Sequence, residues 1–259
     1  MHILLVNDDG IFAPGIKAIA KALKENGHRV SVCAPDRERS AAGHSATLSR
    51  PLRIKNTDFP GAEKAWAANG TPSDCARLGL FLLKDDPVDM VVSGINNGAN
   101  MGGACIYSGT VAAAMEASMH GVPALAVSLC VKWDDPTCIM NADYRASAKL
   151  GAKVAEWMVT QPPLPRGAIY SLNVPLGLYE DIKGVVPATL CPIFLDEALY
   201  RVDRDEDGVC YYYKSGTFPP MDDPNYDGVK IREGYATVTK LTWDIRLSAD
   251  DSEISTITL

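Results

Sequence analysis

The sequence predicts an α/β fold: a Rossmann-like, doubly wound and mostly parallel sheet in three layers (α/β/α), extended by a C-terminal β-hairpin or arm. The main observation is that short apolar runs alternate with segments of helical spacing up to about residue 175. Strands and helices that alternate in this way form parallel sheets covered by helices on both faces. The second observation is that this alternation stops after Pro175, so the remainder of the chain is expected to be built differently.

The first strand and helix set the pattern. Ile3–Val6 is a compact β-rich run, and the turn-like segment Asn7–Gly10 follows it. Pro14–Asn26 then has helical spacing, and Gly27 and His28 end the predicted helix. The apolar face of this helix consists of Ile16, Ile19, Ala20 and Leu23.

Later segments repeat this pattern with different loops. Further strands or apolar runs are predicted at Arg29–Ala34, Val88–Val92, Ala124–Leu129 and Ala168–Val174. Further helices are predicted at Pro72–Lys84, Ser108–His120 and Ala142–Val159. Polar loops are predicted at Pro35–Ser49 and Ser93–Tyr107.

The chain is expected to have two parts. Residues 1–175 form the Rossmann-like α/β core. Residues 176–259 form a C-terminal extension with a β-hairpin or oligomerisation arm, packed on the core or on a neighbouring subunit. Within this extension, 176–235 is rich in Tyr, Asp, Gly and Pro and shows no clear helix, whereas Tyr235–Trp243 alternates like a β-ribbon.

The net charge excludes one broad class of partners. The 259 residues include 25 basic and 32 acidic side chains, which gives a formal charge of −7. A protein with this charge has no general affinity for duplex nucleic acid or for an anionic membrane surface. The apolar fraction of 47% is ordinary for a globular protein with a sizeable core.

The sequence predicts a cytoplasmic protein. No stretch approaches the roughly 20 apolar residues of a membrane span. The apolar start lacks the basic leader of a secretory signal and runs into Asp8 and Asp9. There are seven cysteines, an odd number without Cys-x-x-Cys spacing, and most lie among apolar neighbours. They are therefore expected to be buried free thiols in a reducing compartment.

Polar residues gather after three of the predicted strands. Asn7–Gly10 follows the first strand, 36–45 follows the second, and 93–100 follows Val88–Val92. In open α/β sheets, ligands bind outside the carboxyl ends of the strands, near a reversal of strand order. The three polar segments are therefore expected to meet at one edge of the sheet.

Asp8 and Asp9 are adjacent carboxylates at this predicted edge. Two like charges side by side suggest a hard divalent cation, because Mg²⁺ and Mn²⁺ bind carboxylate, amide, hydroxyl and water oxygens. The alternative is a strand-end turn in which an aspartate caps the next helix. The two other oxygen-rich loops favour the cation.

Two helix starts are candidates for phosphate binding. Ser108, Gly109 and Thr110 open a predicted helix, whose backbone N–H groups and positive dipole end suit a phosphate. The alternative is an ordinary Ser or Thr N-cap. Gly70 and Thr71 precede another helix, where a turn with Pro at the first helical position is a strong alternative to a place at the site. A further loop residue, His44, is a candidate for the same site, although a single loop histidine is more often a surface residue.

The sequence lacks the motifs of several other classes of enzyme and cofactor site. The four histidines, His2, His28, His44 and His120, do not have metal-ligand spacing, which disfavours a three-histidine zinc site. The sequence has no Gly-x-Ser-x-Gly elbow. It also has no Walker loop, and no Gly-x-Gly-x-x-Gly follows a strand, which disfavours a P-loop or a dinucleotide cofactor.

Ordered motifs over residues 1–120, and a shorter one near the end, resemble the SurE family, the stationary-phase survival protein E type of 5′/3′-nucleotidase. The first motif is a strand that runs into Asn-Asp-Asp-Gly. The motifs lie at Asn7–Gly10, Ala34–Ser45, Gly70–Cys75, Ser93–Gly102, Tyr107–Glu116 and Arg232–Tyr235. At Asn97 and Ala99, many relatives carry Arg and Pro, so a basic contact to substrate is expected to be missing here.

The resemblance implies a metal-dependent phosphoric monoester hydrolase that acts on nucleoside monophosphates. It implies one divalent cation per subunit, Mg²⁺ or Mn²⁺, and matches the metal ligands to Asp8, Asp9, Ser40 and Asn96. It also implies homodimers or homotetramers, with a C-terminal hairpin or arm exchanged between subunits.

These observations together predict the catalytic groups. Asp8 and Asp9 hold the metal and orient or deprotonate a water, and the sequence does not divide these two roles between them. Asn96 and Ser40 complete the oxygen ligands. The groups expected to contact the phosphate or the rest of the substrate are Asn100, Ser108, Gly109, Thr110, Gly70, Thr71 and His44.

Two other functions remain open at this stage. One is a sugar-nucleotide glycosyltransferase, because Gly27–Pro35 resembles the second strand of such enzymes. The chain is, however, short for two Rossmann-like domains, which usually need about 100–200 residues each. The other is a non-catalytic nucleotide-binding regulator, which would not need two metal-binding aspartates.

Overall fold

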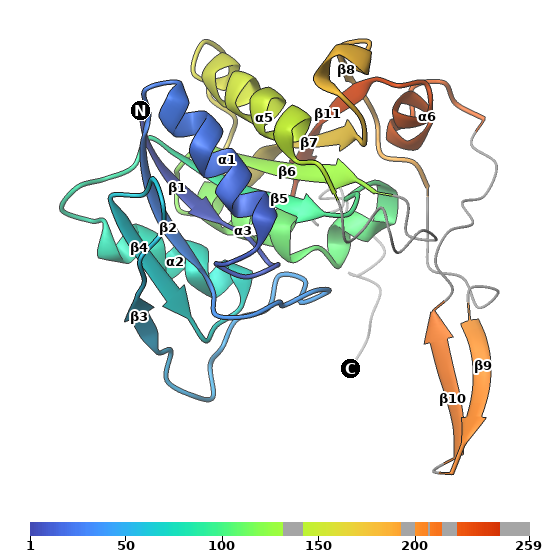
Figure 1. Ribbon diagram of the computed structural model, residues 1–259, viewed down its shortest axis with the longest axis horizontal. Helices are drawn as coiled ribbons and strands as arrows, with labels where there is room; N and C mark the ends of the chain where they lie inside the picture. The colour runs from blue at the N-terminus through green and yellow to red at the C-terminus, as the bar shows by residue number, and fades with distance from the viewer. Residues whose placement is uncertain (132–141, 193–199, 207, 214–221, 244–259) are drawn as a thin grey trace, which may run out of the picture.

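Nine strands form one mixed sheet in the computed structural model of this chain, which describes residues 1–131, 142–192, 200–206, 208–213 and 222–243 (Figure 1). The order of the strands in the sheet is β3-β4-β2-β1-β5-β6-β7-β11-β8. Their bounds are β1 His2–Val6, β2 Arg29–Pro35, β3 Ile54–Asn56, β4 Lys64–Ala68, β5 Met90–Asn97, β6 Ala124–Cys130, β7 Ala168–Pro175, β8 Val185–Pro187 and β11 Ala236–Thr242.

The six central strands, from β4 to β7, run parallel. β1 lies between β2 and β5, so Ile3 is in register with Val30 on one side and Met90 on the other. Every residue of β1 is buried, which explains its continuous apolar run, since a central parallel strand is covered on both faces. From β1 the chain builds β2 and β4 on one side and β5, β6 and β7 on the other, so the strand order reverses between β1 and β5.

Helices cover both faces of this sheet, which confirms the predicted three-layer α/β/α fold (Figure 1). Ile3 and Leu5 pack in the core beneath α1 (Pro14–Glu25) and α5 (Arg145–Met158). Because alternate side chains of a strand point to opposite faces, Leu4 and Val6 pack on the other side. There they meet α2 (Pro72–Leu82) and α3 (Gly109–Met119). The apolar face predicted for the first helix is the face that α1 buries.

The strand predicted at Val88–Val92 differs from the observed one. β5 begins at Met90 and continues through Ser93 and Ile95 to Asn97, into the segment predicted as a loop. Ser93 and Ile95 are fully buried, and β5 stays paired with β6 across a shift in register between Ser93 and Asn96. The polar and glycine-rich composition of this segment suggested a loop, but Ser93 pairs with both β1 and β6, and the pairing with β6 continues to Asn97. The rest of the predicted loop includes a short 3-10 helix, Gly102–Ile106.

The segment 176–235 contains a helix that the sequence analysis did not find. α6 spans only Asp227–Arg232, which is too short for a periodic pattern to be visible. Asp227 is fully buried and accepts hydrogen bonds from the backbone N–H groups of Gly102, Cys191 and Gly228. The hydrogen bond from Gly102 thus connects α6 to the loop that follows β5.

The predicted β-ribbon Tyr235–Trp243 is confirmed as a strand, β11, which pairs antiparallel with β7 in the main sheet. β8 adds in parallel to β11 at the sheet edge. A separate antiparallel pair, β9 (Tyr200–Asp205) and β10 (Gly208–Tyr213), projects away from the layers (Figure 1). The role of this hairpin as an oligomerisation arm stays a prediction.

The five cysteines whose side chains the structure describes are free thiols, and three of them are buried as expected. Cys33, Cys75 and Cys191 are buried free thiols, and Cys105 and Cys130 are half-buried free thiols. The remaining two cysteines lie outside the described side chains. In the described parts of the chain, no helix has the length and apolar character that crossing a membrane requires.

Candidate active site

The candidate site lies at the carboxyl ends of β1 and β5, where the strand order reverses. This is the position at which open α/β sheets bind ligands. Asp8 and Asp9 leave β1 in a turn that is closed by a hydrogen bond of 2.9 Å from Asn7 Nδ2 to the Gly10 carbonyl. Gly10 has a φ of +100°, a backbone conformation that disfavours other residues. The turn therefore presents both carboxylates at the end of the strand.

Asp8 is buried against the start of α3. The hydroxyl of Thr110 donates a hydrogen bond to Asp8 Oδ1. A Cβ atom added to Gly109 would lie 2.9 Å from Asp8 Cβ and 3.0 Å from Asp8 Oδ2, so a glycine is needed there. Burial raises the pKa of Asp8, and the hydrogen bond from Thr110 partly opposes this rise. The positive end of the α3 dipole also favours a carboxylate at this position.

Asp9 is the second carboxylate of the site. The backbone N–H of Asn97, at the end of β5, donates to Asp9 Oδ2 at 3.2 Å. Burial raises the pKa of Asp9 to about 7, and repulsion from Asp8 and Glu38 adds to the effect. Two ionised aspartates at this position therefore destabilise the folded protein unless a positive charge lies beside them.

The loop after β2 reaches the same place. The backbone N–H of Arg39 donates to the Asp8 carbonyl at 2.7 Å. A Cβ on Gly10 would lie 3.1 Å from the backbone of Arg37, so these two segments pack closely. Ser40 is exposed and donates from its hydroxyl to Glu38 Oε1 at 2.5 Å. The structure thus brings the segment that carries Ser40 to the aspartates.

The loop after β5 places its two asparagines differently. Asn96 lies at the end of β5, next to the residue that binds Asp9, and donates from Nδ2 to the Gly98 carbonyl at 2.9 Å. Asn100 is buried, and its Nδ2 donates to Ser128 Oγ at 2.8 Å. Asn173 holds the Asn100 backbone with two hydrogen bonds of 2.9 Å. The amide nitrogen of Asn100 is thus already used within the protein.

Both predicted helix starts have ordinary N-caps, and both lie close to Asp8. Ser108 Oγ accepts from the Val111 N–H at 3.0 Å, and Thr71 forms a capping box with Asp74. The Cβ position of Gly109 lies 2.8 Å from Pro72 Cγ, so α2 and α3 begin side by side. Gly70 precedes this junction. First-turn N–H groups of a helix have no partner within the helix, so two sets of donors meet near Asp8.

His44 is held by a network along α3. Its Nε2 atom lies 2.8 Å from Glu116 Oε2. Glu116 also accepts from Arg77 Nε at 2.9 Å and lies 3.1 Å from His120 Nε2. Thr71 Oγ1 donates to the Ser45 carbonyl at 2.7 Å. These contacts fix the loop that continues from Ser40 against the start of α2 and the middle of α3.

The residues at this edge fit a hard divalent cation. All the side-chain donors are oxygens, and two of them are carboxylates whose charged forms are disfavoured by burial and mutual repulsion. The buried Asn7 Oδ1 atom has no hydrogen-bond partner among the described residues. The site is a polar edge: a cavity of about 1290 Å³ lies elsewhere, between α5 and β11, and neither aspartate lines it. Charge and donor type, rather than volume, identify the site.

Three features of the site were not found from the sequence. Glu38 adds a third negative charge near Asp8 and Asp9. Asn97 contributes its backbone N–H, which no sequence pattern reveals. Thr110, expected to contact phosphate, binds Asp8 directly. The position of Glu38 between Asp36 and Ser40 in a site loop was the one available signal.

Comparison with known proteins identifies the family. The family model "Survival protein SurE" matches residues 3–193. A protein of Synechococcus sp. (strain JA-3-3Ab) named 5′-nucleotidase SurE is 42% identical over 95% of this chain and 93% of its own. One with the same name from Gloeobacter violaceus is 40% identical over 95% of this chain and 91% of its own. The crystal structure of the SurE protein from Aquifex aeolicus superposes with a TM-score of 0.77 at 32% identity, covering 99% of this chain and 98% of that one. The chain belongs to the SurE family.

Proposed function

We propose that this protein is a metal-dependent 5′/3′-nucleotidase, which hydrolyses nucleoside monophosphates to nucleoside and phosphate. The observation that carries the proposal is the adjacent pair of a buried Asp8 and a half-buried Asp9 at the strand-order reversal, beside the start of α3. The names of the relatives, 5′-nucleotidase SurE, support the substrate class. One divalent cation per subunit, Mg²⁺ or Mn²⁺, is proposed to bind Asp8, Asp9, Ser40 and Asn96.

The cation, when bound, supplies charge neutralisation at the phosphoryl group and an acidified water. The chain supplies the rest. Thr110 fixes the orientation of the Asp8 carboxylate. Asp9, with a pKa of about 7 in the absence of a cation, releases its proton near neutral pH and is then a proton acceptor or a ligand. Burial of both groups strengthens every electrostatic interaction at the site.

The substrate is proposed to lie between the starts of the two helices. The backbone at Ser108, Gly109 and Thr110 offers N–H groups at a positive helix end, which suits a phosphate. Gly70 and Thr71 lie at the neighbouring start of α2. Asn100 and His44 are proposed to border the substrate from the two adjoining loops, and the contacts of His44 with Glu116 hold it in place.

The test is a phosphate-release assay with 5′- and 3′-nucleoside monophosphates, each with Mg²⁺, Mn²⁺ or a chelator. We expect release that requires a cation and falls at least about a hundredfold in Asp8→Asn and Asp9→Asn. Asp143→Asn is the control, because Asp143 pairs with Arg145 on the surface. Full activity in chelator would contradict the proposal.

The same assay separates the other functions. A nucleotide-binding regulator would bind nucleotide without turnover at saturating cation. A glycosyltransferase would need an acceptor sugar, whereas we expect hydrolysis without one.

A homodimer or homotetramer and a cytoplasmic location are further parts of the proposal. Sedimentation of the purified protein tests the first, and fractionation of cells that express it tests the second.

A further inference from the structure

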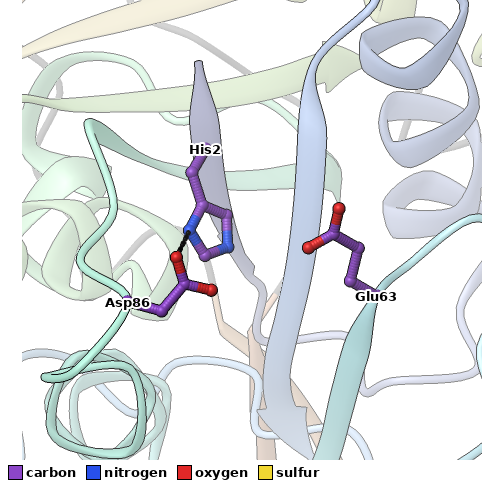
Figure 2. A group of neighbouring side chains, drawn as sticks. All are labelled: His2, Glu63 and Asp86. Atoms are coloured by element: carbon purple, nitrogen blue, oxygen red, sulfur yellow. Dashed lines mark ion pairs between the residues drawn. The ribbon is translucent and has the colours of Figure 1, made fainter.

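Three side chains meet at the opposite end of β1 from the aspartates. His2 begins β1, Glu63 directly precedes β4, and Asp86 lies in the segment that leads to β5. One ligand atom from each lies within 4.8 Å of the other two, which is true of no other group of three His, Cys, Asp or Glu residues in the described chain. Figure 2 shows the imidazole and both carboxylates converging. Six residues of extended chain separate His2 from Asp8, or roughly 20 Å.

The imidazole of His2 is the distinctive member of this cluster. Its side chain is only 4% exposed, and Nε2 lies 2.9 Å from Ser31 Oγ. Nδ1 is buried without a hydrogen-bond partner among the described residues and points toward Asp86 Oδ1, 3.7 Å away (Figure 2). A buried polar atom without a partner is destabilising. When the proton is on Nε2, the lone pair of Nδ1 faces a carboxylate oxygen, and a cation between the two atoms would bind both.

Two basic side chains contact the carboxylates but not this nitrogen. Arg29 donates to Glu63 and to Asp86, with shortest distances of 2.8 Å to each. Lys64 Nζ lies 3.6 Å from Asp86 Oδ2. Arg29 is 48% exposed, so its side chain has room to leave the carboxylates. The guanidinium of Arg29 donates its hydrogen bonds to the two carboxylates and makes none to His2 Nδ1. The charge of Arg29 therefore balances the carboxylates but leaves this nitrogen without a partner.

We propose that His2, Glu63 and Asp86 form a second, structural metal site that takes Zn²⁺ or a similar transition metal. Imidazole nitrogen with carboxylate oxygen is a donor set for such metals, in contrast to the all-oxygen set at Asp8 and Asp9. Tetrahedral zinc with ligands at about 2.1 Å places the ligand atoms about 3.4 Å apart. The His2–Asp86 separation of 3.7 Å is already close to this value.

The remaining movement is small and falls on the surface. The side chain of Glu63 is exposed and has several rotatable bonds, so its carboxylate can move toward the metal. Arg29 must swing out, and a water fills the fourth position. The metal then joins the starts of three sheet strands that are distant in sequence, which stabilises the folded chain by preferential binding.

The test measures Zn²⁺ binding by titration calorimetry in the Asp8→Asn/Asp9→Asn double variant, so that the proposed catalytic cation does not contribute. We expect one Zn²⁺ per chain and a rise in melting temperature on its addition. If the double variant does not fold, the wild-type protein with its oxygen site saturated by Mg²⁺ serves instead. The readout does not depend on nucleotidase activity, so the second metal site and the proposed nucleotidase function are tested independently.

Three further substitutions identify the ligands. His2→Gln retains a nitrogen that reaches Ser31 but removes Nδ1, so Zn²⁺ affinity should fall at least about tenfold. His28→Gln is the matched control, because His28 pairs with one carboxylate, Glu156, at 3.0 Å. It should leave the affinity unchanged. Arg29→Gln removes the competing cation and should tighten binding roughly two- to fivefold.

Two results would overturn this proposal. One is the absence of Zn²⁺ binding in both backgrounds, which would identify the cluster as an ion-pair network only. The other is equal affinity in the parent and in His2→Gln, which would place any bound zinc elsewhere.

Discussion

The hydroxyl of Thr110 is hydrogen-bonded to Oδ1 of Asp8, which joins the first turn of α3 to the end of β1 across 102 positions of the chain. Asp8 is only 5% exposed, so its carboxylate has few other ways to be satisfied. The helix start therefore sets the direction in which Asp8 presents its oxygens.

Thr110→Val tests this relationship. Valine keeps the shape of threonine but removes the donor, so the Asp8 carboxylate loses its fixed orientation. Loss of such a supporting hydrogen bond lowers metal affinity or activity about 10- to 100-fold. The measurement is phosphate release as a function of cation concentration. Thr110→Ser, which keeps the hydroxyl, should retain most of the activity, and equal losses in both variants would argue against this role.

Gly109→Ala tests the close approach of α3 to the site. The added methyl group would lie 2.9 Å from Asp8 Cβ, so the aspartate or the helix must shift. Overpacking of this kind destabilises by about 1–3 kcal/mol. Gly79→Ala is a matched control, since its methyl group would meet Leu4 Cδ2 at 2.7 Å in the core. Both variants should melt at lower temperature, but only Gly109→Ala should lose activity under conditions where both are folded.

Asp9→Asn tests the repulsion between the two aspartates in protein without a cation. The folded-state pKa of Asp9, about 7, lies above the unfolded value of about 3.9. The folded state therefore binds the proton more tightly, and stability falls as pH rises from about 4 to 7. The variant should melt at a temperature higher than wild type above pH 7, by at least about 2 °C, and the difference should shrink toward pH 4.

Added Mg²⁺ is the control for this pH series. It should raise the melting temperature of the wild-type protein at pH 8 and have little effect on Asp9→Asn. A difference between the two proteins that stays constant from pH 4 to pH 8 would show that Asp9 has no raised pKa.

Glu116→Gln tests the network that holds His44. Burial alone would raise the pKa of Glu116, but hydrogen bonds from Arg77 and His44 hold it below its usual range. The stabilisation is therefore present above about pH 4.3 and lost as pH falls through the lower folded-state pKa. The variant should lose about 1–3 kcal/mol at pH 7 and approach the wild type below pH 4. Chemical denaturation at both pH values measures this, and the more exposed Glu156→Gln should show a smaller loss.

The sequence was a good guide wherever one strong local pattern determined the structure. The apolar run Ile3–Val6 lies in the centre of the sheet, and the aspartates that end it lie at the strand-order reversal. These positions follow from alternation of elements and from the rule for ligand binding in parallel sheets. The same rule predicted that the loops carrying Ser40 and Asn96 meet the aspartates, and the resemblance to the SurE family then matched these two residues to metal ligands.

The sequence was a poor guide where long-range contacts decide. Ser93 continues a strand because β1 and β6 pair with β5 on either side, although the local composition suggests a loop. α6 is too short for a helical period to appear. The approach of Glu38 to the aspartates, and that of Glu63 to His2, depend on tertiary packing, which spacing along the chain does not encode.

The two outermost strands of the main sheet also bear on how the protein avoids self-association through its edges. β3 and β8 contain three residues each, so the outermost strand at each edge offers few backbone groups to a neighbouring sheet. Lys55 places a charge in β3, and Pro187 removes a hydrogen-bond donor from β8. Short edge strands, lysine and proline are the means by which natural sheets resist edge-to-edge aggregation. The outermost strand at each edge of the described sheet is thus short and contains a residue that disfavours pairing with another sheet.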